Sequence, residues 1–241
     1  MSPARRRATG RTRPRVVTGA RLVGRALARA LFRLQVRGLE HVPADGPVLL
    51  AGNHSGFVDG PLVFLLSPRP AALLAKSEIF AGAGARVFGW LGLIPVHRGA
   101  ADREALHAGL AVLSGGGALG VFPEGARGSG ELEDVAHGLA YLALRSGAQV
   151  VPIAVLGSAA AWPKRRPLPR LRAPVRVVFG APVRVDVAGD PRARRTVAAA
   201  AEQLRVALVA HLRSSSDSAR SPGSAEPLDG AAFPGSKEEG T

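Results

Sequence analysis

The chain has 241 residues, and its 32 Lys and Arg against 18 Asp and Glu give a formal net charge of +14. A hydrophobic content of 46% excludes a wholly disordered chain, and the length allows one large domain with a sizeable core. The absence of cysteine excludes a disulfide scaffold, a thiolate zinc site and a thiol nucleophile.

The positive charge is concentrated in two segments. Residues 1–37 contain eleven Arg and no acidic residue, and residues 161–195 contain ten basic residues and two acidic ones. The rest of the chain has a small net negative charge. This distribution predicts polyanionic partners: nucleic acid, an anionic membrane or phosphorylated small molecules.

Residues 16–35 predict a cationic amphipathic helix. Apolar side chains, among them Leu27 and Leu31, fall opposite a stripe of arginines that recur at every fourth position. The stripe consists of Arg21, Arg25, Arg29 and Arg33. Such a helix lies in a membrane interface, or it packs its leucines on its own domain and leaves the arginines in water. We expect residues 1–37 to form a basic arm and membrane-surface helix, in a peripheral or monotopic protein at the cytoplasmic face of the cell membrane.

From residue 38 onward, short apolar runs alternate with helical patterns. The predicted strands are 47–52, 71–75, 93–96, 118–122, 149–155 and 175–179, and the predicted helices are 61–67, 79–91, 101–114, 134–146 and 191–212. This alternation predicts an α/β fold, with a single domain at 38–213 whose mixed, largely parallel sheet is covered by helices. Ser, Gly, Pro and acidic residues dominate 214–241 and predict a disordered acidic tail. No stretch is typical of a transmembrane helix or a secretory signal.

His54 and Asp59 form a candidate general-base pair directly after the first predicted strand. In such a pair the imidazole takes a proton, and the carboxylate fixes its tautomer and stabilises the imidazolium. Positions five apart point about 140° apart on a helix. The pair therefore requires His54 in a loop and Asp59 in the first turn of the next helix. A capping Asp beside an incidental His is the alternative interpretation.

Charged residues also follow three other predicted strands. Lys76 follows 71–75, Arg98 lies just after 93–96, and Glu124 and Arg127 come after 118–122. Ligands of open α/β sheets bind beyond the carboxyl ends of the strands. The His54/Asp59 pair and three cationic side chains at one edge of the sheet predict a phosphorylated substrate from which a proton is abstracted. Taken alone, Pro-Glu-Gly is equally typical of a surface turn.

The order of these motifs resembles the glycerolipid acyltransferase family, whose best-known members are lysophosphatidic acid (1-acylglycerol-3-phosphate) acyltransferases. The matching motifs are N-H-x4-D, K-S-E-I-F, I-P-V-x-R, F-P-E-G-x-R and V-V-P-I-A. The resemblance covers residues 38–152, with weaker similarity through 175–185. Together and in this order the motifs are specific, although each alone is weak.

The resemblance implies an O-acyltransferase that moves a fatty acyl group from acyl-CoA or acyl-carrier protein to a lysophospholipid hydroxyl. The expected acceptor is 1-acylglycerol-3-phosphate, His54 is the general base, and Asp59 orients it and balances its charge. The implied phosphate-binding residues are Lys76, Arg98, Glu124, Gly125 and Arg127, and the implied site-shaping residues are Asn53, Pro123 and Pro152. No metal and no cofactor is expected beyond the acyl donor as co-substrate.

Departures from the family pattern keep other acceptors open. The chain has Gly128 where Ser or Thr is common, His137 where a Lys is expected, and the apolar Phe57-Val58 before Asp59. A different lyso-lipid or glycolipid acceptor, or a member that kept the fold without the activity, stays an alternative.

A basic nucleic-acid-binding protein is the alternative from another class, because the net charge is compatible with one. Aromatic residues make up only 5%, and nucleic acid is not an expected partner. The chain also lacks the Gly-x-Ser-x-Gly motif of serine hydrolases, and its six His include no close helical pair.

Overall fold

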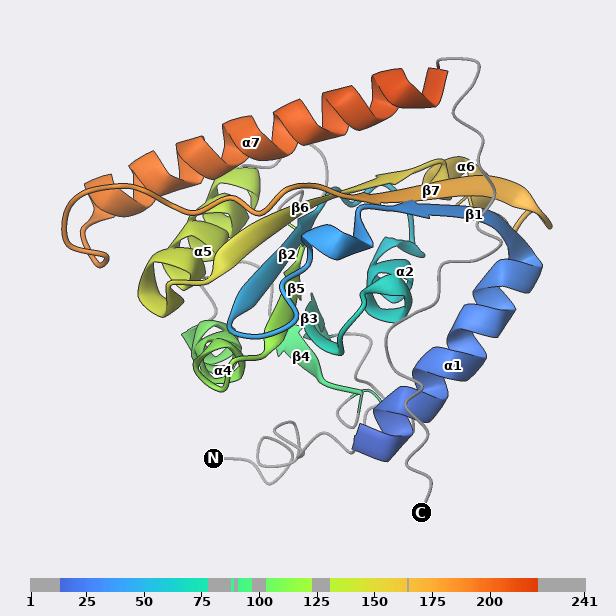
Figure 1. Cartoon of the computed structure of the whole chain (residues 1–241), viewed down its shortest axis with the longest axis horizontal. Coiled ribbons are helices and arrows are strands. Elements are labelled where there is room, and N and C mark those ends of the chain that lie inside the picture. Colours follow the sequence, from blue (N-terminus) through green and yellow to red (C-terminus); the bar gives the residue numbers. More distant parts are fainter. Residues whose placement is uncertain are drawn as a thin grey trace.

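One sheet with helices on both faces forms the core of the protein (Figure 1). The computed structural model describes residues 14–77, 88, 91–96, 103–122, 131–163 and 165–220. Its strands are β1 (Phe32–Arg37), β2 (Val48–Gly52), β3 (Ala71–Lys76), β4 (Leu93–Val96), β5 (Ala118–Val121), β6 (Gln149–Leu156) and β7 (Ala173–Phe179). Its helices are α1 (Pro14–Leu31), η2 (Leu39–His41), α2 (Asp59–Leu66), α4 (Arg103–Ser114), α5 (Glu131–Ser146), α6 (Ser158–Ala161) and α7 (Arg194–Arg220).

The seven strands lie in the order β1-β7-β6-β2-β5-β3-β4. All neighbours are parallel except β6 and β7, which are antiparallel, so β1 and β7 run against the other five strands. The central strand β2 is buried along its whole length, which explains its continuous apolar run. The expected single α/β domain with a mixed, largely parallel sheet is confirmed.

The helices form two layers, with α1 and α2 on one face of the sheet and α4, α5 and α7 on the other (Figure 1). Successive side chains of a strand point to opposite faces. Leu50 of β2 therefore joins the core that contains Leu62 of α2, whereas Leu49 joins the core that contains Leu139 of α5 and Leu204 of α7. None of the described helices is both long and apolar enough to cross a membrane.

The N-terminal helix exists but is shorter than expected. It ends at Leu31, and the following residues form β1, an edge strand paired with β7. Phe32 and Val36 are buried there, opposite Ala173 and Val177. Apolar residues alternate at 32, 34 and 36, a pattern typical of a strand. The predicted helix over residues 16–35 overlaps this strand and is wrong there. The expected boundary at residue 37 therefore falls after an edge strand of the sheet, and residues 32–37 belong to the domain.

Two arginines of the predicted stripe, Arg21 and Arg25, face the domain, whereas Arg29 and Arg33 are exposed. Arg21 is buried and donates to the carbonyl of Ser67, while Arg25 donates to the carbonyls of Leu65 and Ser67. These carbonyls close the C-terminal end of α2, where they have no intrahelical partner and carry the negative end of the helix dipole. Burial, with a smaller effect of Arg25, lowers the pKa of Arg21 to about 10, so its guanidinium stays charged at neutral pH.

The opposite side of α1 presents apolar side chains to solvent. Leu22, Val23 and Leu27 are exposed, and Arg29 lies at the end of this surface. The exposed side of α1 therefore carries apolar residues together with Arg29, and Leu27 does not pack on the domain.

The C-terminal helix is longer than expected. Residues 214–220, which composition assigns to the tail, continue α7, and residues 221–241 lie outside the described residues. Ser215 is buried within this helix, so composition alone misplaces its end. The expected helix at 79–91 lies almost wholly outside the described residues.

Gly38 joins β1 to η2 and provides a test of this packing. Its φ is +73°, and an added Cβ would overlap the carbonyl oxygen of Phe179 at the end of β7. Gly46 has a similar φ of +76° but open space around it, so it is a matched control. Gly46→Ala bears only the left-handed backbone strain, about 1–2 kcal/mol. In urea unfolding, Gly38→Ala should lower the free energy of unfolding by about 1–3 kcal/mol more than Gly46→Ala does, because the backbone around the Phe179 carbonyl must move. Equal losses in the two variants would contradict this packing.

Candidate active site

The loop between β2 and α2 is fastened to the neighbouring strand by Asn53. Its side-chain Nδ2 donates to the carbonyl of Val155 at 2.9 Å, and its Oδ1 accepts the backbone N–H of Val155 at 2.7 Å. The Asn53 amide therefore continues the β2–β6 pairing by one step beyond Gly52, where the backbone leaves the sheet. This clamp sets the position from which His54 projects.

His54 and Asp59 lie together as the sequence requires, one in the loop and the other in the first turn of α2. His54 Nδ1 is 3.4 Å from Asp59 Oδ2, a separation that is loose for a hydrogen bond. Such contacts in ligand-free sites commonly tighten when substrate binds. The His54 side chain is 42% exposed, whereas Asp59 is fully buried. The pair therefore joins a solvent-accessible imidazole to a carboxylate held inside the protein.

Two further features stabilise the buried carboxylate. The backbone N–H of Gly56 donates to Asp59 Oδ2 at 2.6 Å, and the carboxylate sits at the N-terminal end of α2, where the helix dipole favours negative charge. Its Oδ1 is buried and has no hydrogen-bond partner among the described residues. The carboxylate therefore keeps acceptor capacity next to the imidazole.

The sequence interpretation missed the contact of this loop with α6. Ser158 is buried, and its Oγ lies 3.1 Å from Ser55 Oγ. An added Cβ on Gly56 would lie 2.8 Å from Ser158 Oγ and 2.9 Å from the backbone nitrogen of Ala159. Gly56 is therefore needed for close approach. No local sequence signal predicts this contact, because the partners are about a hundred residues apart.

Aromatic side chains border the imidazole. Phe122, directly after β5, has its ring centre 5.3 Å from that of His54, and Phe57 packs edge-on against Trp162 at 5.8 Å. Phe57 is itself 68% exposed. Phe122 thus lies beside the imidazole, whereas Phe57 joins the same loop to Trp162, directly after α6.

The parallel topology brings the carboxyl ends of β3, β4 and β5 to the edge of the sheet at which β2 ends. Lys76 ends β3, Val96 ends β4 just before Arg98, and Phe122 precedes the third motif. The structure describes only the backbone of Lys76. Four predicted site positions, together with Arg98, lie outside the described residues: Pro123, Glu124, Gly125 and Arg127.

Pro152 lies inside β6, opposite Ala51 and before the end of the strand. Its carbonyl accepts the N–H of Gly180 at 2.8 Å. Pro152 therefore belongs to the β2–β6 pairing, three residues before Val155, to which Asn53 is bonded.

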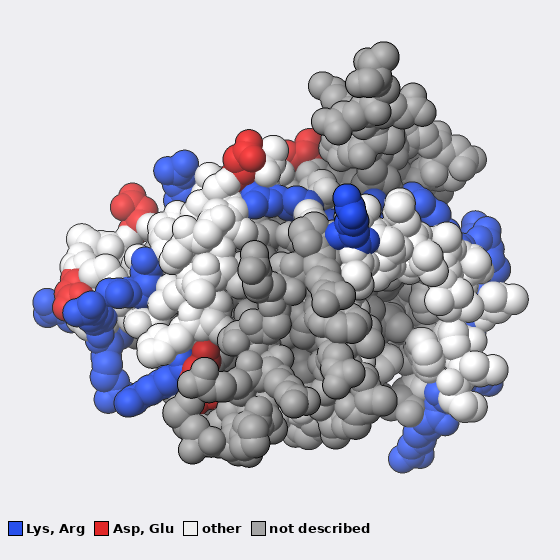
Figure 2. All heavy atoms as spheres, turned by 90° about the horizontal axis from the view of Figure 1, so that it is seen from below, with Lys and Arg blue, Asp and Glu red and all other residues white. Residues whose placement is uncertain are grey.

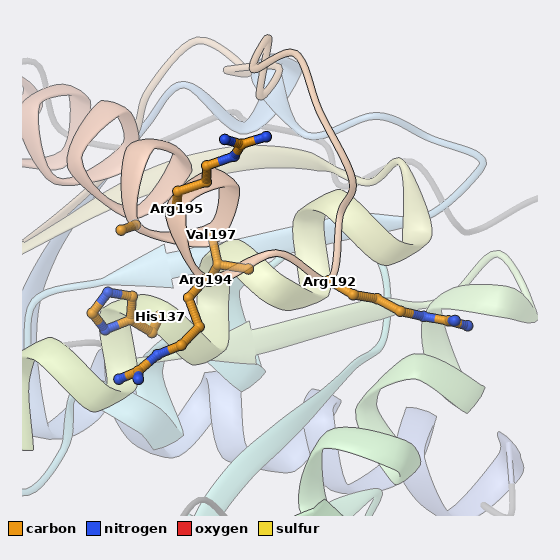
Figure 3. A pocket seen from close by; sticks show the side chains of 6 residues that line it. His137, Arg192, Arg194, Arg195 and Val197 are labelled. Carbon is orange, nitrogen blue, oxygen red and sulfur yellow. The ribbon is translucent and has the colours of Figure 1, made fainter.

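A separate hollow of about 410 Å³ lies between α5 and the start of α7, where the Arg194 side chain extends toward His137 and that of Arg195 points away from it (Figure 3). Its lining contains no residue from the loops that follow the parallel strands. The guanidinium groups of Arg192, Arg194 and Arg195 point in different directions and do not converge on one point (Figure 3). In the described part of the chain, no group of three or more His, Asp or Glu side chains is placed to hold a metal ion.

Comparison with known proteins agrees with the motifs. The family model described as Acyltransferase matches residues 33–156, from the second residue of β1 to the end of β6. A chloroplastic 1-acyl-sn-glycerol-3-phosphate acyltransferase of Arabidopsis thaliana is 28% identical over 55% of this chain and 38% of its own length. An enzyme of that name from Cocos nucifera is 30% identical, over 56% of this chain and 45% of the relative. The chain thus matches half or less of the length of these curated relatives.

A solved structure shares the fold. The crystal structure of the 1-acyl-sn-glycerophosphate acyltransferase PlsC from Thermotoga maritima superposes with a TM-score of 0.59, at 23% identity, over 82% of this chain and 79% of that one. The motifs and the matched family model agree on one assignment. The chain belongs to the Acyltransferase family, as its resemblance to the glycerolipid acyltransferases implied.

Proposed function

We propose that this protein transfers a fatty acyl group from acyl-CoA or acyl-carrier protein to the free hydroxyl of 1-acylglycerol-3-phosphate, giving phosphatidic acid. The observation that carries the proposal is the pairing of a half-exposed His54 with the buried Asp59. The names of the curated relatives support the class of acceptor.

The geometry of the pair suits general-base catalysis. Because Nδ1 of His54 faces the Asp59 carboxylate, the imidazole holds its proton on that nitrogen and leaves the Nε2 lone pair free. Nε2 takes the proton of the acceptor hydroxyl while the oxygen of that hydroxyl attacks the thioester carbonyl carbon. The carbon–sulfur bond then breaks, and the thiolate receives the proton from the imidazolium. Asp59 stabilises that imidazolium between the two steps.

Phosphate recognition is assigned to residues at the ends of β3, β4 and β5. The phosphate-binding set consists of Lys76, Arg98, Glu124, Gly125 and Arg127. Support comes from the parallel topology, which directs these strand ends to the edge that carries His54. A panel of lyso-lipids with different head groups tests the assignment, with phosphate monoesters expected to be the best acceptors.

A peripheral or monotopic position at the cytoplasmic face of the cell membrane completes the proposal. Its support is the exposed apolar side of α1, formed by Leu22, Val23 and Leu27. In Figure 2 the right-hand side of the molecule, where α1 lies in Figure 1, is a mostly uncharged surface bordered by Lys and Arg. An apolar helix face with cations at its border is typical of interfacial helices.

Removing the base should abolish most of the turnover. His54→Ala is expected to lower kcat by at least about a hundredfold with labelled acyl-CoA and lysophosphatidic acid, because general-base catalysis contributes that much. Asp59→Asn should lower kcat substantially, since the amide favours the wrong tautomer. The control is His107→Ala on the exposed side of α4. Turnover of His54→Ala equal to that of the control would refute the assignment.

The close approach of Gly56 to α6 makes a second prediction. Gly56→Ala pushes the loop away from Ser158 and Ala159 and should lower kcat by about tenfold or more, since small misplacements of catalytic groups are costly. Gly60→Ala is the matched control, because its added Cβ meets Phe122 at an ordinary 3.6 Å and lies in helix α2. If both variants keep full activity, the Gly56 contact does not position the base.

Membrane binding by α1 is tested by polar substitutions on its exposed side. Val23→Ser with Leu27→Ser should reduce the fraction that sediments with phosphatidylglycerol-containing vesicles by about tenfold, because apolar burial drives insertion. Val206→Ser on the exposed side of α7 is the control. Deletion of residues 1–37 is unsuitable, because it removes β1 from the sheet. Unchanged sedimentation of the double variant would contradict the role of α1.

A further inference from the structure

The segment between α6 and β7 presents two leucines to solvent. In this segment, which we call the basic loop (residues 165–172), Leu168 is 72% and Leu171 is 71% exposed. Single exposed leucines are common on protein surfaces and need no explanation. Two largely exposed leucines three residues apart in one loop need an explanation if the loop has a defined conformation.

Hydrogen bonds at both ends define the conformation of the basic loop. The Trp162 indole N–H donates to the carbonyl of Arg166 at 3.1 Å, and the N–H of Arg170 donates to the carbonyl of Ala161 at 2.8 Å. Arg172 has a φ of 58°, a conformation that residues other than glycine seldom adopt unless their surroundings impose it. The exposure of the two leucines is therefore built into the fold.

Arg172 also fastens the basic loop to α1. Its backbone N–H donates to the carbonyl of Leu31 at 2.6 Å, and its Nη1 donates to the carbonyl of Arg29 at 3.0 Å. These acceptors are at the C-terminal end of α1, and Figure 1 places that end beside the start of β7. The basic loop is therefore fastened to the end of the helix that carries the exposed Leu22, Val23 and Leu27.

The charge of the basic loop identifies its partner as an anionic lipid surface. The loop contains Arg165, Arg166, Arg170 and Arg172 and no acidic residue. Guanidinium groups bind phosphate well, and arginines around exposed leucines match the polar and apolar layers of a membrane interface. A second copy of the chain would bring like charges together, and the loop itself offers no aromatic side chain on which a base could stack.

The basic loop is also connected to the candidate active site. Trp162, which holds the loop through Arg166, packs edge-on against Phe57, three residues from His54. Ser158, the first residue of the α6 helix that precedes Trp162, contacts Ser55. A lipid surface that holds the loop therefore lies close to the residues that surround the base.

We infer that the basic loop inserts Leu168 and Leu171 into an anionic leaflet and forms, with α1, a second membrane contact beside His54. This inference rests on the proposed lipid acyl transfer, because it explains how an acceptor reaches the base while its chain stays in the leaflet. The arginines bind lipid phosphates, and the leucines enter the acyl layer.

A fluorescent probe measures the insertion directly. The natural chain has no cysteine, so Leu168→Cys supplies a single attachment point for the environment-sensitive dye NBD. With full-length protein and phosphatidylcholine vesicles containing phosphatidylglycerol, we expect a blue shift, a rise in emission and quenching by spin-labelled acyl chains. The same dye on Val206→Cys should stay in water. A dye at 168 that stays in water on vesicle-bound protein overturns the inference, as does a response only to an oligonucleotide.

Turnover supplies the second readout. Leu168→Ser with Leu171→Ser should keep its activity on a short-chain acceptor dissolved as monomers and lose about tenfold on acceptor embedded in anionic vesicles. Equal activity on embedded acceptor would overturn the inference. Absence of turnover in the unmodified protein on every acceptor would instead contradict the proposed function, and the NBD measurement would still decide whether the loop inserts.

Discussion

The buried carboxylate of Asp59 is the constraint on which the candidate site depends. A charge with no exposure to water must be compensated inside the protein, since its desolvation is costly. The start of α2, the N–H of Gly56 and the imidazole of His54 supply that compensation. Each of them requires the loop after β2 to follow one path, and the double hydrogen bond of Asn53 to Val155 sets where that path begins.

The inward orientation of Arg21 and Arg25 in α1 follows from a similar need. The last carbonyls of α2 require donors, and the guanidinium groups of Arg21 and Arg25 provide them. Once these arginines point inward, the apolar side of α1 has no described part of the protein to cover it. Helix α1 thus caps α2, the helix that carries Asp59, and also presents an apolar surface to its surroundings. The proposed catalytic pair and the proposed membrane contact thus lie on two helices that pack against each other.

Much of the fold was predictable because its signals are local. The apolar run at 93–96 predicted that strand. The spacing of five residues between His54 and Asp59 predicted that the first lies in a loop and the second in the first turn of a helix. What failed depended on tertiary partners. The edge strand β1 is defined by pairing with β7, and the inward arginines are defined by the end of α2. The Ser158 contact of Gly56 joins segments that sequence order keeps far apart.

The central claim is that Asp59 acts through His54 on the acceptor hydroxyl, and a double-mutant cycle tests it most directly. Turnover of labelled acyl-CoA with lysophosphatidic acid would be compared among His54→Ala, Asp59→Asn and the combined variant. If the two residues form one catalytic unit, the combined variant should be no slower than His54→Ala alone. Losses that multiply would contradict the account, because they would mean that the two side chains act independently.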